Sequence, residues 1–150
     1  DTMNLWIDLF PDKVWKLISM VNVFMINDEE AMQLSKENDL NKIADKFLSY
    51  GPKIVIIKKG SEGSLLAYSD KKINISAVPN VNVVDPTGAG DSFAGGVLGY
   101  IANNGLENPE QAVIHGSAIA SYTVSNFGLE GLSSIDKVQL NKKINTIKWK

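Results

Sequence analysis

The sequence predicts an α/β fold in which helices flank a mostly parallel sheet in three layers, with only part of such a sheet inside these 150 residues. Two apolar runs of strand length, Val21–Ile26 and Ile54–Ile57, alternate with amphipathic helical patterns. The second half contributes helices rich in small residues. With 44% apolar residues and no internal repeat or long linker, we expect one domain or part of one.

The first half of the chain indicates two successive strand–helix units. The opening residues 1–4 are typical of the carboxyl end of a strand and its polar loop, as if the fold began earlier in the chain. Pro11 suits the first turn of a helix, and acidic residues after Asn27 suit the start of another. The expected elements are helix 11–20, strand Val21–Ile26, a helix from Asp28, helix Leu40–Leu48 and strand Ile54–Ile57.

The second half predicts an antiparallel addition to the sheet followed by two helices. Ser64–Tyr68 and Lys72–Ser76 have strand composition and are joined by the short turn Ser69–Lys71. Small residues dominate Ala89–Ile101 and Pro109–Val124, so these two helices should pack closely together.

Composition excludes several classes of function. The chain has no cysteine, so disulfides, thiolate catalysis and cysteine-bound zinc are absent, and a reducing cytoplasmic location is expected. His115 is the single histidine, which excludes a multi-histidine metal site. All 15 basic residues are lysines and the net charge is −2, so we expect no nucleic-acid partner. No apolar run approaches the roughly 20 residues that span a bilayer, so no membrane association is expected.

The segment Val83–Gly96 carries the strongest chemical signal. Gly88, Ala89 and Gly90 leave backbone amides unshielded where a helix is about to begin, which is typical of a phosphate site. Asp91 lies in the same first turn, where its carboxylate can accept a proton from an incoming hydroxyl. Composition alone leaves a second interpretation open, in which Asp91 caps the helix and the glycines serve packing.

Two common phosphate motifs do not fit. A Walker A loop requires a Gly-Lys dipeptide, and the chain contains none. The dinucleotide fingerprint requires a third glycine where Phe93 stands. We therefore expect neither a P-loop NTPase nor a nicotinamide enzyme.

The segment from Asp85 to Leu98 resembles the second signature of the ribokinase-like carbohydrate kinases, the PfkB family, Asp-x-Thr-Gly-Ala-Gly-Asp at the start of a helix. The resemblance implies a ribokinase-like fold and ATP-dependent phosphorylation of a sugar or nucleoside hydroxyl. It also implies that Asp91 is the catalytic base and that Gly88, Ala89 and Gly90 form the anion hole.

Other positions match the family's nucleotide site. The Asn-x-x-Glu motif of the family appears at Asn27 and Glu30, which implies that they organise Mg²⁺ and phosphates through water; an ordinary acidic helix start is the alternative. Gly60 and Gly63 match a Gly-x-x-Gly turn along the nucleotide, although plain hairpins use the same pattern. Lys58 stands where the family has threonine, so it either supplies a positive charge to ATP or points elsewhere.

Further carried-over positions concern the cation and the adenine. Family members with a monovalent-cation site use the positions of Asp85 and Thr87, with carbonyls from a loop that corresponds here to Ser125–Ser134, which leaves a K⁺ site open. Ser117 replaces a common asparagine on the helix near the adenine. His115 is expected to be structural or exposed rather than catalytic.

The resemblance covers the whole chain but only the C-terminal half of a kinase. Residues 1–150 are therefore expected to be the nucleotide-binding and catalytic part, with the N-terminal acceptor-binding and lid part absent. This leaves two interpretations: a carbohydrate or nucleoside kinase whose isolated fragment is inactive, or a non-catalytic nucleotide-binding module that depends on another polypeptide. A small-molecule acceptor is the expected partner and a homodimer is left open; the residues that would select the acceptor are not in this sequence.

Overall fold

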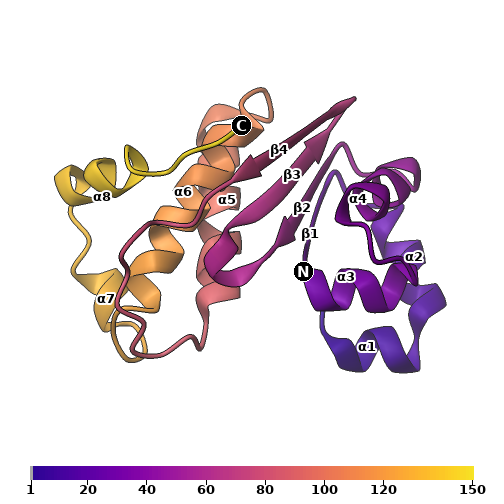
Figure 1. Cartoon of the computed structure of the whole chain (residues 1–150), viewed down its shortest axis with the longest axis horizontal. Helices are drawn as coiled ribbons and strands as arrows, with labels where there is room; N and C mark the ends of the chain where they lie inside the picture. Colours follow the sequence, from indigo (N-terminus) through magenta and orange to yellow (C-terminus); the bar gives the residue numbers. More distant parts are fainter. Residues whose placement is uncertain (1) are drawn as a thin grey trace. The chain divides into compact units, whose positions relative to one another are not determined.

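The computed structural model describes residues 2–150, which form two compact units (Figure 1). The first unit contains the chain up to Gly60 together with Ser64–Asn74, and the second contains Ser61–Gly63 together with Ile75–Lys150. The elements in chain order are α1 (Asn4–Leu9), α2 (Pro11–Ile18), β1 (Val23–Asn27), α3 (Asp28–Ser35), α4 (Leu40–Ser49), β2 (Ile54–Lys58), the 3₁₀ helix η1 (Gly60–Glu62), β3 (Ser64–Tyr68), β4 (Lys71–Ile75), α5 (Ala89–Asn104), α6 (Pro109–Thr123), α7 (Glu130–Ser133) and α8 (Lys137–Ile144).

The sheet is mixed, with the strand order β1-β2-β3-β4. β1 and β2 are parallel, and Val23 pairs with Ile54 in their register. β3 runs antiparallel to β2, and two residues join it to β4, the first of them Ser69 with φ 51°. The expected α/β class, the parallel pair and the antiparallel addition are therefore confirmed.

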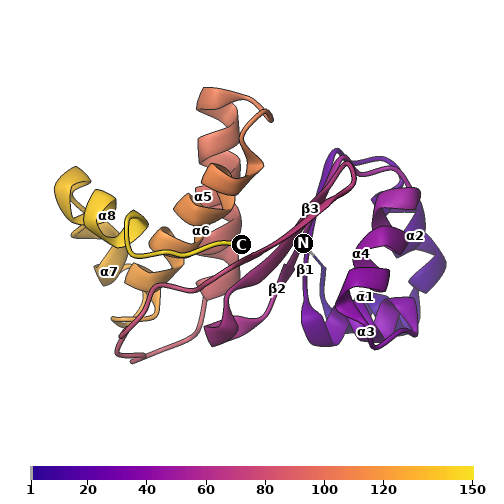
Figure 2. The ribbon, with the colours of Figure 1, turned by 45° about the horizontal axis from the view of Figure 1, so that its top comes forward.

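Helices α1 to α4 lie on one side of the strands in both ribbon views (Figure 2). Their apolar faces and one face of the sheet form a single buried cluster. The aromatic ring of Phe47 from α4 meets Phe24 of β1 edge to face, with ring centroids 5.1 Å apart, and also contacts Trp15 of α2. The cluster contains Ile7, Val14, Ile18, Phe24, Ile26, Ala31, Leu34, Ile43, Ala44, Phe47, Val55, Ile57, Leu65 and Ala67.

The beginning of the chain differs from the expected loop. Asp1 lies outside the described residues, but Asn4 is the first residue of α1 rather than part of a polar loop. The helix is stabilised by tertiary packing, because Ile7 is buried in the core cluster. A six-residue helix shows too little periodicity for the sequence to reveal it.

Close contact between α5 and α6 dominates the second unit. Neither Gly96 nor Gly116 has a side chain, and a Cβ added at Gly96 would lie 2.8 Å from the Cα of Gly116. The expected close packing of these helices is therefore present. Near the carboxyl terminus, Ile75 bridges to Trp149, and Ser76 donates its N–H to the carbonyl of Lys148 at 2.8 Å.

The loop expected at Ser125–Ser134 is shorter than its sequence suggested, because its second part forms α7. Gly128 has φ 56°, which agrees with a turn at Phe127–Gly128. Across residues 2–150, none of the helices is both long and apolar enough to cross a membrane.

Candidate active site

The loop before α5 is closed by its own backbone and by one carboxylate. Asp85 accepts a hydrogen bond from the N–H of Thr87 at 2.9 Å, and the carbonyl of Pro86 accepts from the N–H of Ala89 at 3.1 Å. Gly88 then serves as the N-cap of α5 in the left-handed region, with φ 78° and no side-chain cap. The sequence thus begins the helix with a backbone turn in place of a capping side chain.

The first turn of α5 presents open amide groups. The N–H of Ser92 is the first in the helix to bond within it, donating to the carbonyl of Gly88 at 2.9 Å. Within residues 2–150, the N–H groups of Gly88, Gly90 and Asp91 have no acceptor, whereas that of Ala89 is occupied by Pro86. Open amides at a helix N-terminus attract anions, because they carry the positive end of the helix dipole.

Asp91 is exposed at the third position of α5, beside these amides. The helix cannot rotate freely, because Phe93 and Val97 bury the opposite face. Open backbone amides and a solvent-facing carboxylate therefore share one turn of helix, an arrangement that is suited to general-base-assisted phosphoryl transfer.

Hydrogen bonds from the end of α6 hold this loop in place. The carbonyl of Val124 accepts hydrogen bonds from the N–H groups of Val84 at 2.7 Å and Asp85 at 3.2 Å. Thr123, which is 3% exposed, donates its hydroxyl to the hydroxyl of Ser92 at 2.7 Å. The chain on both sides of the Asp85–Gly90 loop is thereby tied to one helix end.

The same turn sets the charge of Asp85. The backbone N–H of Thr87 and then its side chain donate to this carboxylate, and these hydrogen bonds hold its pKa below the usual aspartate value. These hydrogen bonds favour the anionic form of Asp85.

In the first unit, Asn27 and Glu30 meet at the start of α3. The side chain of Asn27 accepts the N–H of Glu30 at 2.7 Å, and Glu30 in turn accepts the N–H of Asn27 at 3.4 Å. The pair is a reciprocal capping box, and Glu30 is only 6% exposed. The helix-start interpretation of this motif is thus present in the structure.

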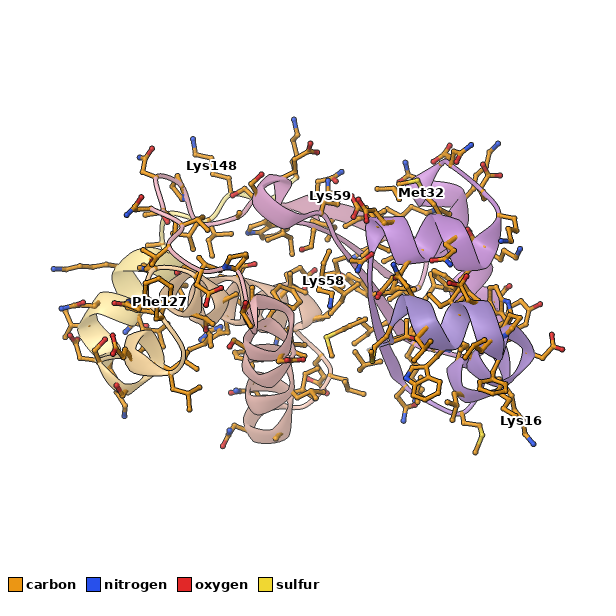
Figure 3. All side chains as sticks on the ribbon, turned by 90° about the horizontal axis from the view of Figure 1, so that it is seen from below. Lys16, Met32, Lys58, Lys59, Phe127 and Lys148 are labelled. Carbon is orange, nitrogen blue, oxygen red and sulfur yellow. The ribbon has the colours of Figure 1, made fainter. Side chains whose placement is uncertain are left out.

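Lys58 and the two glycines follow at the end of β2. Lys58 is half-buried and pairs with Asn27 in the strand register, so the Asn-x-x-Glu motif and Lys58 lie on neighbouring strand ends. Gly60 begins η1. Gly63 has φ 91°, and a Cβ there would collide with the carbonyl oxygen of Ile75, so glycine is required. Figure 3 labels Lys58 and its neighbour Lys59, whose amine reaches Asn74 at 2.9 Å.

Ser117 and His115 both lie on α6. Ser117 is buried. His115 donates a hydrogen bond from Nδ1 to the carbonyl of Gln111 at 2.7 Å, and the centroid of its ring lies 4.6 Å from the ring centroid of Tyr100. These local contacts agree with the structural role expected for His115.

The structure therefore gathers the predicted residues into two groups, one in each unit. Asp85, Thr87 and Gly88–Asp91 form one loop and helix start, whereas Asn27, Glu30 and Lys58 lie at the ends of β1 and β2. Among residues 2–150, no three His, Asp or Glu side chains gather as a metal cluster. Sequence reasoning missed Thr123 and the carbonyl of Val124, because neither belongs to a recognisable motif, and it assigned no contact to Ser92, whose partner lies 31 residues away.

Comparison with known proteins gives the family. Residues 2–135 match the pfkB family carbohydrate kinases, and the chain belongs to this family. A fructokinase of Salmonella thompson is 36% identical over 110 residues, covering 69% of this chain and 49% of the relative. A nucleoside kinase of Methanocaldococcus jannaschii is 36% identical over 125 residues, covering 82% of this chain and 39% of the relative. The chain thus spans half or less of the length of these relatives.

The fold agrees with solved structures of kinases. The structure of aminoimidazole riboside kinase from Salmonella enterica, complexed with aminoimidazole riboside and an ATP analogue, superposes with a TM-score of 0.79 at 26% identity. The match covers 91% of this chain and 46% of that one. The expected ribokinase-like fold and its partial extent are therefore confirmed.

Proposed function

We propose that this chain supplies the catalytic half of an ATP-dependent kinase that phosphorylates a hydroxyl of a sugar or nucleoside. The observation that carries the proposal is the first turn of α5, where Asp91 shares a turn with open amide groups. Family membership supports it. The named activities of the relatives, fructokinase and nucleoside kinase, support a sugar or a nucleoside as the acceptor.

In this proposal Asp91 accepts the proton of the acceptor hydroxyl as that oxygen attacks the phosphoryl group. The N–H groups of Gly88 and Gly90, with that of Asp91, stabilise the negative charge on the transferring group. The sequence predicted Ala89 as a further donor of the anion hole. Its N–H can donate to a bound phosphoryl group only after it breaks its hydrogen bond to the carbonyl of Pro86. MgATP, when bound, supplies the phosphoryl group.

The remaining residues are proposed to handle the nucleotide and its ions. Asn27 and Glu30 orient the hydration shell of Mg²⁺, for which amide and carboxylate oxygens are suitable partners. Asp85 and Thr87 contribute to a K⁺ site. Four further residues are proposed to contact the nucleotide, because they occupy positions that contact it in the family: Lys58, Gly60, Gly63 and Ser117.

Calorimetry and a coupled ADP assay on the complete gene product test the function. We expect Mg²⁺-dependent binding of ATP, and ADP formation that depends on an acceptor when D-fructose, D-ribose, cytidine and adenosine are supplied in turn. EDTA provides the control for the metal. ATP binding without turnover on any sugar or nucleoside would favour the non-catalytic module, and the absence of Mg²⁺-dependent ATP binding by the folded protein would overturn both.

A further inference from the structure

The start of α5 has little intrinsic order of its own. Local hydrogen bonds close the loop as far as Ala89, but Gly88 provides no side-chain cap and Gly90 adds flexibility, so the local sequence fixes the first helical turn itself only weakly. A proton acceptor must nevertheless be held within a fraction of an ångström of its target. The orientation of Asp91 must therefore come from tertiary contacts.

Thr123 provides such a contact immediately next to the candidate base. Its hydroxyl donates to Ser92, the residue after Asp91, at 2.7 Å, and the bond joins positions 31 residues apart in the chain. Thr123 is the last residue of α6 and is 3% exposed. Its β-branched side chain has few rotamers, so the direction of the hydroxyl is set by the helix that carries it.

The same helix end also holds the chain that leads into this loop. The buried side chain of Thr123 contacts the first turn of α5 through its hydroxyl. The carbonyl of the next residue, Val124, accepts hydrogen bonds from the N–H groups of Val84 and Asp85.

We propose that Thr123 is a positioning residue, which holds the carboxylate of Asp91 in its catalytic orientation through the hydroxyl of Ser92. This inference rests on the proposed function and assigns a role to a residue outside the family signature. Thr123 touches neither substrate nor reacting atoms; it acts by fixing the rotation of the first turn of α5.

Thr123→Val in the complete gene product removes the hydroxyl while keeping the shape. With the best acceptor among D-fructose, D-ribose, cytidine and adenosine, kcat should fall about tenfold or more, because small displacements of a base are costly. The KM for ATP should stay within about twofold. Thr123→Ser keeps the hydroxyl and should retain kcat within about twofold, and Ser92→Ala should reproduce the loss from the other side of the bond.

Thr146→Val is the matched control, because the hydroxyl of this exposed threonine donates to the carbonyl of Lys143 at 2.6 Å, within the turn that follows α8. It should leave kcat unchanged. Amide hydrogen exchange of residues 88–96 gives a readout independent of turnover: it should accelerate in Thr123→Val and stay unchanged in Thr146→Val.

The double variant Thr123→Val/Asp91→Asn tests whether Thr123 acts by positioning Asp91 or by a general effect on the folded structure. If Thr123 acts through Asp91, the valine should lower the residual rate of the asparagine variant by less than twofold. An equal loss in both backgrounds, or full kcat in Thr123→Val, overturns the inference. A normal rate in Asp91→Asn alone would instead overturn the assignment of the base, so the two failures are distinguishable.

Discussion

Asp91 stands at the third position of α5, where its exposed carboxylate shares a turn with open backbone amides. An acidic residue there also interacts favourably with the helix dipole. The position of Asp91 is therefore compatible both with a helix cap and with a catalytic base. The two roles differ in what the side chain must do. A cap needs only a hydrogen-bond acceptor or a charge, whereas a base needs a group that can take up a proton.

Asp91→Asn separates these roles. We expect kcat to fall about 10²- to 10⁴-fold, because the amide cannot accept the proton of the acceptor hydroxyl. ATP affinity measured by calorimetry should change no more than a few-fold, since the open amides remain. Near-normal turnover would identify Asp91 as a cap, and a collapse of ATP binding would show that its role is structural or linked to the metal.

The pair α5 and α6 is the element that presents the site. Its two helices approach at Gly96 and Gly116, and the end of α6 holds the loop before α5 through Val124. Glycines on α5 are not equivalent: Gly96 faces the backbone of α6, whereas Gly99 has no atom within 4 Å of where its Cβ would be. The same substitution should therefore have opposite effects at the two positions.

Gly96→Ala should destabilise the complete gene product by about 1–3 kcal/mol, because its Cβ would lie 2.8 Å from the Cα of Gly116. Gly99→Ala, on the open side of the same helix, should stabilise it by about 0.5–1 kcal/mol through helix propensity. Thermal and urea unfolding measure both. Equal effects of the two alanines would contradict the observed packing.

At the scale of the whole molecule, the first unit leaves apolar groups and a sheet edge open. β1 has only β2 as a neighbour among the described strands. On α2 and just after it, Leu17 is 61% exposed and Met20 is 70% exposed. Exposed apolar patches and unpaired strand edges both promote association.

Residues 1–150 expressed alone should therefore self-associate, which sedimentation velocity measures directly. Replacing Leu17 and Met20 by lysine should shift the population towards monomer, because charges oppose burial of the patch. Leu129 and Val138, apolar residues of the second unit that are exposed to a similar degree, provide the control pair for lysine substitution. A monomeric chain at high concentration would contradict the expectation.

The sequence by itself determined the alternation of the strands with the longer helices from Pro11 to Val124, and the family signature between Asp85 and Leu98. These features depend on neighbours within one element: the run at Ile54–Ile57 and the glycines before Asp91 show their character within a few residues. Family membership confirms what the Asp85–Leu98 segment indicated. The chemical roles of these residues stay predictions, because chemistry depends on ligands that the chain alone does not contain.

Only the tertiary structure decided which groups are bonded and which remain open. Helix α1 depends on burial of Ile7, the hydrogen bond from Thr123 reaches Ser92 from another helix, and the amide of Ala89 is occupied by Pro86. None of these follows from local periodicity. Contacts between distant residues, and the competition of a backbone group among several acceptors, are settled only when the helices pack, because packing selects the partner that each polar group meets.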